Sequence, residues 1–194
     1  MASVVRRDRW AQRFEREAAA LAHALGEGVV AIEHVGATSV PGLAARPILD
    51  VLVGLPGPGP TPAQLAALER LDYRPPRRRA GRAYVCKGRP REVTVHFAQW
   101  GSPRWWRLVD FRDALRGEAD ARRRYEELKA SLSRAGQARY AEGKRRFVES
   151  ELQRIAVGRR GPHIGSRTLR ATKVSRREHD TEIDPRSRPH SPSV

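Results

Sequence analysis

The residues whose types and spacing best suit chemistry lie in one short segment in the first third of the chain. Gly36 and Ala37 follow an apolar, β-branched run, and two hydroxyl residues, Thr38 and Ser39, come next. Hydroxyl residues favour the N-cap of a helix, and free backbone N–H groups at such a point attract anions. Arg46 adds positive charge a few residues further on. We therefore expect a phosphate-binding turn here.

A single acidic residue, Asp50, interrupts the next apolar run, 47–55. A carboxylate is costly to bury in a strand unless it binds a cation or hydrogen-bond donors. A phosphate at the turn and Mg²⁺ on Asp50 are mutually compatible. Alternatively, the glycine only forms a tight turn, a hydroxyl only caps the helix, and Asp50 pairs with an arginine.

Two histidines and an arginine are further candidates. His34 and His96 each lie in an apolar run, so we expect them on adjacent strands, where they serve as bases or ligands or are simply hydrogen-bonded. Arg112 precedes Asp113 in a helical pattern. Its guanidinium either reaches a phosphate or pairs with the neighbouring carboxylate and braces the helix.

The periodicity of apolar residues predicts the elements that position these side chains. Thr61 to Gln64 is a capping box with proline at the first helical position. The order of elements is typical of an α+β (α/β-like) domain, with a small mixed sheet packed with helices and a C-terminal helical layer. We expect helices at 8–25, 61–71, 105–115, 118–132 and 139–157, and strands at 29–35, 47–55, 83–86 and 92–97.

The chain is strongly basic, with 38 Lys/Arg against 22 Asp/Glu and a formal charge of +16. Eight basic residues and no acid lie between Arg74 and Arg91. The segment 158–194 is basic and rich in proline and serine, and it has too few apolar residues to offset its ordering entropy. We expect a folded domain at 1–157 and a disordered basic tail at 158–194.

Composition also limits the class of protein. The one cysteine, Cys86, excludes an intramolecular disulfide framework. No apolar run approaches the roughly 18 residues of a membrane span, so we expect a cytoplasmic protein without membrane contact. A basic stripe attracts nucleic acid or phosphates, but no helix-turn-helix or RNP motif accompanies it. Sequence-specific reading of nucleic acid is therefore poorly supported.

Several separated segments resemble the GrpB family, a group with a nucleotidyltransferase-like fold. The resemblance covers about residues 8–157, and the motifs occur in the family's order. The matching segments are Trp10 with the helix after it, the His34 strand, 35–53, 95–96, 111–116, 125–129 and 140–144.

The resemblance implies a small sheet of the nucleotidyltransferase type. In that superfamily a glycine turn holds the triphosphate, and strand carboxylates hold magnesium that assists in-line attack on the α-phosphate. By position, the turn 36–39 would face phosphate, and Asp50 would be the catalytic residue and the first metal ligand. Lys129 and Lys144 match recurring family positions and would support the site.

The sequence departs from the superfamily's pattern at three places. The usual pair of carboxylates lies two residues apart on one strand face, and Leu52 stands at the second position. Ala37 replaces the usual small polar residue, and the later strand carries His96 rather than a third carboxylate. A helix residue such as Asp113 is another source of a carboxylate.

Three functions follow as hypotheses. The first is metal-dependent transfer of a nucleotidyl group from a nucleoside triphosphate to a small acceptor. The second is a catalytically decayed module that has lost its metal site and either binds a nucleotide or phosphorylated ligand or assists a partner enzyme. Because some members of the family are joined to dephospho-coenzyme A kinase, this module is linked by analogy to coenzyme A metabolism. The third is non-specific binding of nucleic acid through the basic segments.

Overall fold

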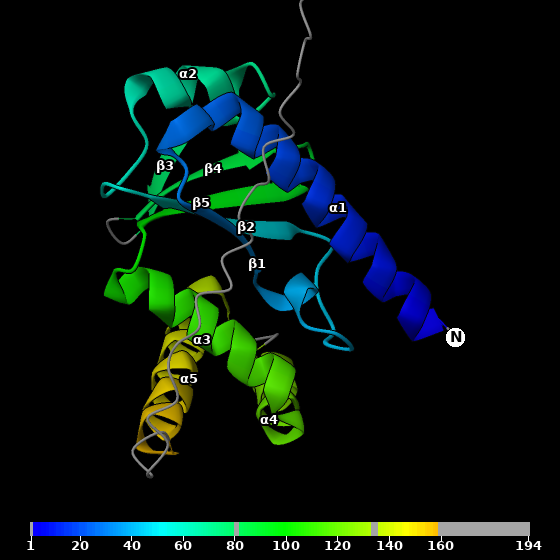
Figure 1. Ribbon diagram of the computed structural model, residues 1–194. Helices are drawn as coiled ribbons and strands as arrows, with labels where there is room; N and C mark the ends of the chain where they lie inside the picture. Colours follow the sequence, from blue (N-terminus) through cyan, green and yellow to red (C-terminus); the bar gives the residue numbers. More distant parts are fainter. Residues whose placement is uncertain (1, 80–81, 133–135, 159–194) are drawn as a thin grey trace, which may run out of the picture.

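Figure 1 shows the computed structural model of the chain, which describes residues 2–79, 82–132 and 136–158. The helices are α1 (Ala2–Leu25), α2 (Pro62–Glu69), α3 (Pro103–Gly117), α4 (Ala119–Leu132) and α5 (Gly136–Gly158), with short 3-10 turns η1 (Gly26–Gly28) and η2 (Ala37–Ser39). The strands are β1 (Ala31–Val35), β2 (Leu49–Leu55), β3 (Arg74–Arg79), β4 (Arg82–Lys87) and β5 (Val93–Gln99).

The strands form one mixed sheet in the order β1-β2-β5-β4-β3. Strands β2 and β5 run parallel, and the other neighbouring pairs are antiparallel. Strand β2 is therefore hydrogen-bonded on both sides, to β1 and to β5. The α+β fold with a small mixed sheet is thereby confirmed.

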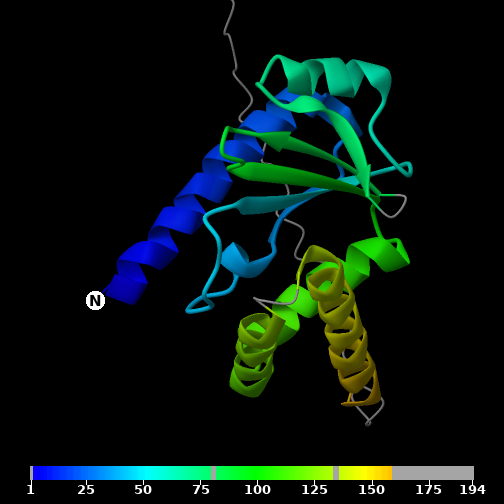
Figure 2. The same ribbon diagram turned by 180° about the vertical axis from the view of Figure 1, so that it is seen from behind.

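Helices α1 and α2 cover one face of the sheet (Figures 1 and 2). Alternate residues of β2 point to this face, and Val51 and Val53 are fully buried there against Leu21 of α1. Helix α2 begins with the predicted capping box, because Thr61 and Gln64 exchange side chain–backbone hydrogen bonds. These contacts make this face the main hydrophobic core.

Helix α3 packs on β1, β2 and β5 on the opposite face. Leu52 and Ala98 contact Trp105 in this second cluster. A Cβ atom on Gly54 would lie 2.7 Å from the Trp105 ring, so the glycine in β2 lets the helix approach the sheet. Asp50 points to this same face, because it lies two residues before Leu52.

Helices α4 and α5 form the predicted C-terminal helical layer. Tyr125 of α4 stacks on Phe147 of α5 with ring centroids 5.4 Å apart, and Phe111 of α3 meets both rings edge-on. The loop after η2 adds Val40 and Leu43 to this cluster. The loop between β1 and β2 is therefore anchored to the C-terminal helices.

Strand β3 lies where the sequence analysis expected none. Its start carries Pro75 and Pro76, which argue against a strand interior. The structure places them at a sheet edge, where the register shifts between Arg74 and Arg77. An edge strand with a bulge tolerates residues that lack a backbone N–H.

The other limits differ by a few residues, since α1 begins at Ala2 rather than residue 8 and β1 begins at Ala31 rather than residue 29. Apart from Gly158, which ends α5, the predicted tail 158–194 lies outside the described residues. Across the described ranges, every helix is too short or too polar to cross a bilayer.

Candidate functional site

The turn after β1 and the acid of β2 meet in the structure. Gly36 has a φ of 74°, a conformation that glycine adopts readily. A Cβ atom at Gly36 would lie 2.5 Å from Oδ2 of Asp50, so only glycine lets the carboxylate pack against the turn. Val35 pairs with Asp50 across β1 and β2, and this register produces the approach.

The nearest polar partner of Asp50 is a histidine. His96 of β5 places Nε2 3.3 Å from Oδ1 of Asp50, and the two side chains are 30% and 31% exposed. Among the described residues, no lysine or arginine nitrogen forms an ion pair with this carboxylate. The expected alternative, in which an arginine seals Asp50, is absent there, and the carboxylate remains open to solvent.

The two hydroxyl residues of the turn are satisfied internally. Ser39 donates its hydroxyl to the Gly36 carbonyl over 2.6 Å, and Thr38 donates to the Ile48 carbonyl over 3.2 Å. Both side chains are buried. These hydroxyls therefore shape the turn and tie it to the start of β2. Ala37 is the first residue of η2 and follows Gly36 directly.

His34 lies on the other face of the sheet from His96. It stacks on Phe14 of α1 with ring centroids 5.0 Å apart, and Nε2 lies 3.1 Å from the Thr38 hydroxyl oxygen. Burial, helped by the charge of Arg116, lowers the pKa of His34 to about 4 although Asp50 acts in the opposite direction. The imidazole is therefore neutral at pH 7.

The expectation that His34 and His96 lie on adjacent strands is wrong. Strand β2 separates β1 from β5. His34 pairs with Val51, whereas His96 pairs with Leu52, and consecutive residues of a strand point to opposite faces. Only His96 shares a face with Asp50.

Arg112 is a brace between α3 and β1. Its guanidinium donates to the carboxylates of Glu33 and Asp113 and to the His34 carbonyl, and the side chain is buried. Burial alone would lower the pKa of Arg112, but the hydrogen bonds with Asp113 and Glu33 raise it. This geometry supports the bracing interpretation, and it holds Asp113 in the brace rather than beside Asp50.

Two lysines from the C-terminal helices converge on Tyr125. Lys129 donates to the Ala44 carbonyl over 2.6 Å and lies 5.0 Å from the centre of the Tyr125 ring. Lys144 of α5 lies close enough to Tyr125 for the two groups to interact electrostatically. The Lys144 side chain is exposed, and Tyr125 and the Asp50 carboxylate raise the pKa of Lys144. Lys144 therefore stays protonated and extends the site toward α5.

Arg46 lies on the loop between η2 and β2, where its side chain is exposed. Its own carbonyl accepts a hydrogen bond from the Ile48 amide over 2.7 Å. The neighbouring Ala44 carbonyl is held by Lys129, so the loop that carries Arg46 is fixed to α4. Because the exposed guanidinium has no partner within the described ranges, it can turn toward a ligand.

The donor set around Asp50 does not fit a resident magnesium centre. Mg²⁺ takes oxygen ligands in octahedral geometry, usually from carboxylates. His96 supplies a nitrogen, Leu52 supplies no ligand, and Glu33 is engaged by Arg112. Within the described ranges, no group of three His, Cys, Asp or Glu side chains is placed to hold a metal ion.

Sequence reasoning did not assign roles to Glu33 and Tyr125. Leu52 stands where the superfamily has its second carboxylate, and Glu33 of the neighbouring strand pairs with Leu52. An acidic residue therefore lies beside this position. Tyr125 links both lysines, although its spacing predicts only a buried helix position. The role of Glu33 would follow from the pairing register of β1 and β2, which the sequence does not give. No local sequence pattern indicates the role of Tyr125.

Comparison with known proteins places this geometry in a family. The family model described as GrpB protein matches residues 3–154. A UPF0157 protein of Pseudomonas aeruginosa is 38% identical over 175 residues, which cover 84% of this chain and 71% of that protein. A UPF0157 protein of Halalkalibacterium halodurans is 31% identical over 75% of this chain and 77% of its own length.

A solved structure shows the same fold. The crystal structure of the conserved protein GrpB from Enterococcus faecalis superposes with a TM-score of 0.60 at 30% sequence identity, and it covers 74% of this chain and 94% of that one. The match of the family model extends from α1 into α5 and so includes the Gly36 turn, Asp50, His96 and Lys144. On these grounds the chain belongs to the GrpB family.

Proposed function

We propose that the protein binds a nucleotide or another phosphorylated small molecule at the Asp50 site. One observation carries this proposal: Gly36 lacks the Cβ atom that would displace Asp50, and the carboxylate stays 31% exposed beside His96. A glycine turn packed against an open strand carboxylate is the arrangement that the superfamily resemblance implies for a nucleotide site.

The cations around the site suit the phosphates of such a ligand. Lys144 and Lys129 approach from the C-terminal helices, and Arg46 lies on the connecting loop. Fixed cations bind phosphate oxygens through charge-assisted hydrogen bonds. The carboxylate of Asp50 repels phosphates, so it faces a hydroxyl-bearing part of the ligand or of a second substrate.

Binding is tested by titrating nucleoside triphosphates and coenzyme A into the protein while following heat and thermal unfolding. We expect saturable stabilisation for at least one ligand. Lys144→Met should raise its Kd about tenfold, since one charge-assisted contact is lost. The matched control is Arg70→Met, which removes one exposed charge at the end of α2 on the other face. An equal loss in both variants, or no saturable ligand, would contradict the proposal.

Nucleotidyl transfer is a second candidate because Asp50 and His96 form a carboxylate–imidazole pair at 3.3 Å. The pair would take the proton of an acceptor hydroxyl, the acceptor oxygen would attack the α-phosphorus, and pyrophosphate would leave. Release of pyrophosphate measures this step. We expect Asp50→Asn to abolish release while it leaves nucleotide affinity within about threefold. Unchanged turnover in Asp50→Asn would exclude the transfer.

A further inference from the structure

A cavity of about 360 Å³ lies over β3 and β4, beside the Asp50 site rather than within it. Its charged lining consists of Arg74, Arg77 and Arg91, and Tyr84, Ile48 and Pro90 supply apolar walls. This volume lies at the lower end of the range found for small-molecule pockets. The cavity therefore suits a compact ligand.

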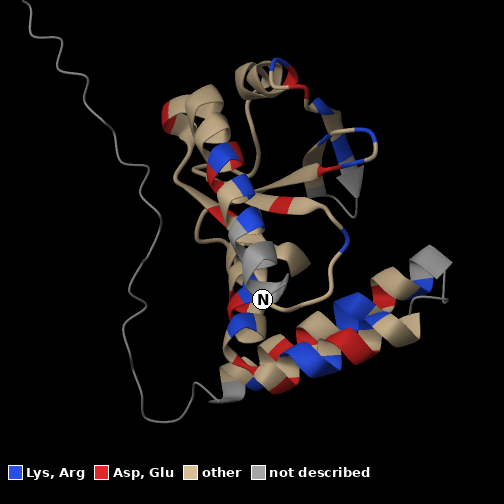
Figure 3. Cartoon of the chain, turned by 90° about the vertical axis from the view of Figure 1, so that its right-hand side faces the viewer, with Lys and Arg blue, Asp and Glu red and all other residues tan. Residues whose placement is uncertain are grey.

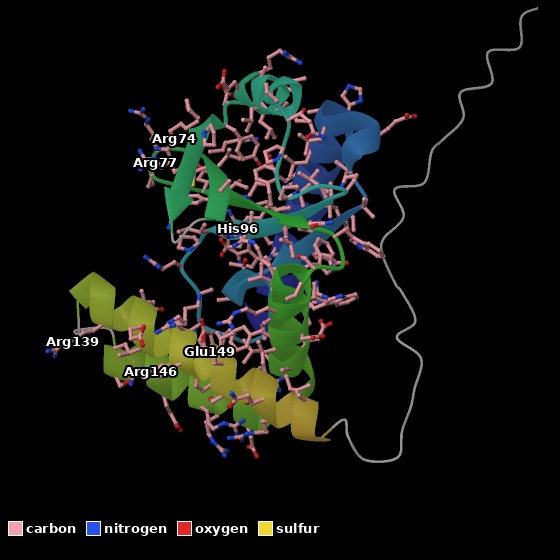
Figure 4. The ribbon with its side chains drawn as sticks, turned by 90° about the vertical axis from the view of Figure 1, so that its left-hand side faces the viewer. Arg74, Arg77, His96, Arg139, Arg146 and Glu149 are labelled. Carbon is pink, nitrogen blue, oxygen red and sulfur yellow. The ribbon has the colours of Figure 1, made fainter. Side chains whose placement is uncertain are left out.

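The shift in register within β3 aims two of the arginines into the cavity. Residues three apart on a regular strand point to opposite faces. Arg74 pairs with Cys86 and Arg77 pairs with Tyr84, so three steps on β3 match two steps on β4. Because Cys86 and Tyr84 share a face, their partners share it as well. Figure 4 shows Arg74 and Arg77 together on β3.

None of the described residues that line this cavity carries a carboxylate. The nearest acid in sequence, Glu92, forms an ion pair with Arg13 over 2.7 Å. Arg74 donates to the Gly88 carbonyl over 3.1 Å, whereas Arg77 and Arg91 have no side-chain partner among the described residues. Two guanidinium groups are thus left to bind an anion. Figure 3 shows Lys and Arg on the hairpin of β3 and β4.

Two residues of the cavity wall, Tyr84 and Ile48, lie beside the Asp50–His96 pair. Tyr84 pairs with His96 across β4 and β5, and the two rings lie 6.4 Å apart. Ile48 lies two residues before Asp50 and accepts the Thr38 hydrogen bond through its carbonyl. A ligand in the cavity therefore lies alongside the Asp50–His96 pair.

We propose that this cavity is a binding site for a small anion that carries at least two clustered oxyanion groups, phosphate or carboxylate. Arginine binds such groups through two parallel hydrogen bonds, and three arginines without an acid favour a multiply charged ligand. Tyr84 and Ile48 would contact its apolar part. The anion site stands independently of the proposed function.

Isothermal titration with pyrophosphate and, separately, with citrate tests the site and distinguishes its two chemistries. We expect saturable binding of at least one probe near one equivalent. Arg77→Met and Arg91→Met should each weaken it about tenfold. Both side chains are exposed, so these changes remove charge without opening the core. Thermal unfolding of each variant without a probe checks that it folds.

Arg70→Met is the matched control, since it removes one exposed arginine from the other face of the sheet. Its affinity for the probe should equal that of the wild type. An equal loss in Arg70→Met, or no saturable binding of either probe, would overturn the site. Salt-sensitive binding of duplex DNA without saturable binding of either probe would also overturn it, because the stripe would then act as a nucleic-acid surface.

Asp50→Asn and Lys144→Met separate this proposal from the proposed function. Neither variant should bind citrate more weakly than the wild type does, because neither residue lines the cavity and Asp50→Asn removes a negative charge rather than a positive one. If nucleotide binding fails while probe binding depends on Arg77, the anion site stands and the proposed function does not. If nucleotide binding depends on Lys144 while neither probe binds, the reverse holds.

Discussion

At the scale of single residues, the Asp50 carboxylate is exposed and weakly paired because several of its neighbours neither cover it nor form an ion pair with it. Gly36 contributes no side chain, Leu52 contributes no charge, and Arg112 is already held by Glu33 and Asp113. Among the residues that the structure describes, the carboxylate therefore has only the imidazole of His96 as a side-chain hydrogen-bond partner. An open, weakly paired carboxylate on a central strand is costly for stability, and it is suited to a proton-accepting role.

The hydrogen bonds of His34 assign its tautomer. Thr38 donates its one hydroxyl hydrogen to the Ile48 carbonyl, which can only accept. His34 must therefore donate from Nε2 to the Thr38 oxygen. The ring serves as a neutral link between α1 and the turn rather than as a catalytic base.

We predict that His34 makes stability fall in acid. Its pKa is lowered from 6.5 to about 4, so the unfolded chain binds a proton between these values that the folded chain does not. Stability is therefore complete above pH 6.5 and declines as the pH falls toward 4, by about 3 kcal/mol from this group.

Urea unfolding at several pH values measures this effect, with His34→Gln as the comparison. The variant should lose less stability than the wild type between pH 7 and pH 4, since glutamine does not titrate. Parallel pH profiles of the two proteins would refute the assignment.

At the scale of elements, prediction from sequence succeeded where the pattern is local. The capping box at Thr61, the hairpin formed by β4 and β5, and the C-terminal helices follow from spacing and turn residues. The apolar run of β2, with its lone acid Asp50, was also predicted as a strand. Local periodicity is enough for these features, because each involves neighbours in sequence.

What depends on strand order and register could not be predicted. The insertion of β2 between β1 and β5 separates His34 from His96 and places His96 beside Asp50. Strand β3 was missed because Pro75 and Pro76 conceal it, although the bulge there accommodates them. The sequence left Arg112 open between a phosphate ligand and a brace, because no sequence pattern shows that Glu33 lies opposite.

We predict that the capping box contributes about 1 kcal/mol to stability. Thr61 accepts from the Gln64 amide, and the Gln64 side chain accepts from the Thr61 amide and donates to the Leu25 carbonyl. Thr61→Ala removes the hydroxyl acceptor and should lower the free energy of unfolding in urea by that amount. Thr61→Ser keeps the hydroxyl and should lie within about 0.5 kcal/mol of the wild type. An equal loss in both variants would show that the cap is not responsible.

At the scale of the whole molecule, the sheet separates two kinds of packing. Helices α1 and α2 complete an apolar core on one face, whereas α3 covers only the β1, β2 and β5 part of the other. The remaining part carries Tyr84 and the arginine-lined cavity. The face that the helices leave incomplete therefore holds both candidate binding sites.

We predict that a chain ending at Gly158 keeps the stability of the full chain. Phe147 of α5 packs into the C-terminal cluster, and Val148 and Glu151 are the buried positions in the described part of this helix. Removing 159–194 should therefore change the free energy of unfolding in urea by less than about 0.5 kcal/mol. A larger loss would mean that the predicted domain limit near residue 157 is wrong.

The prolines of β3 hinder edge-to-edge association between copies of this protein. The edge strand of a sheet has unpaired backbone N–H and C=O groups, and a strand of another molecule can hydrogen-bond to them and start aggregation. Pro75 and Pro76 present no amide hydrogen along that margin, and the arginines beside them repel a second copy of the same hairpin. The bulge in β3 that shapes the cavity thus also opposes the addition of strands from other copies at this edge of the sheet.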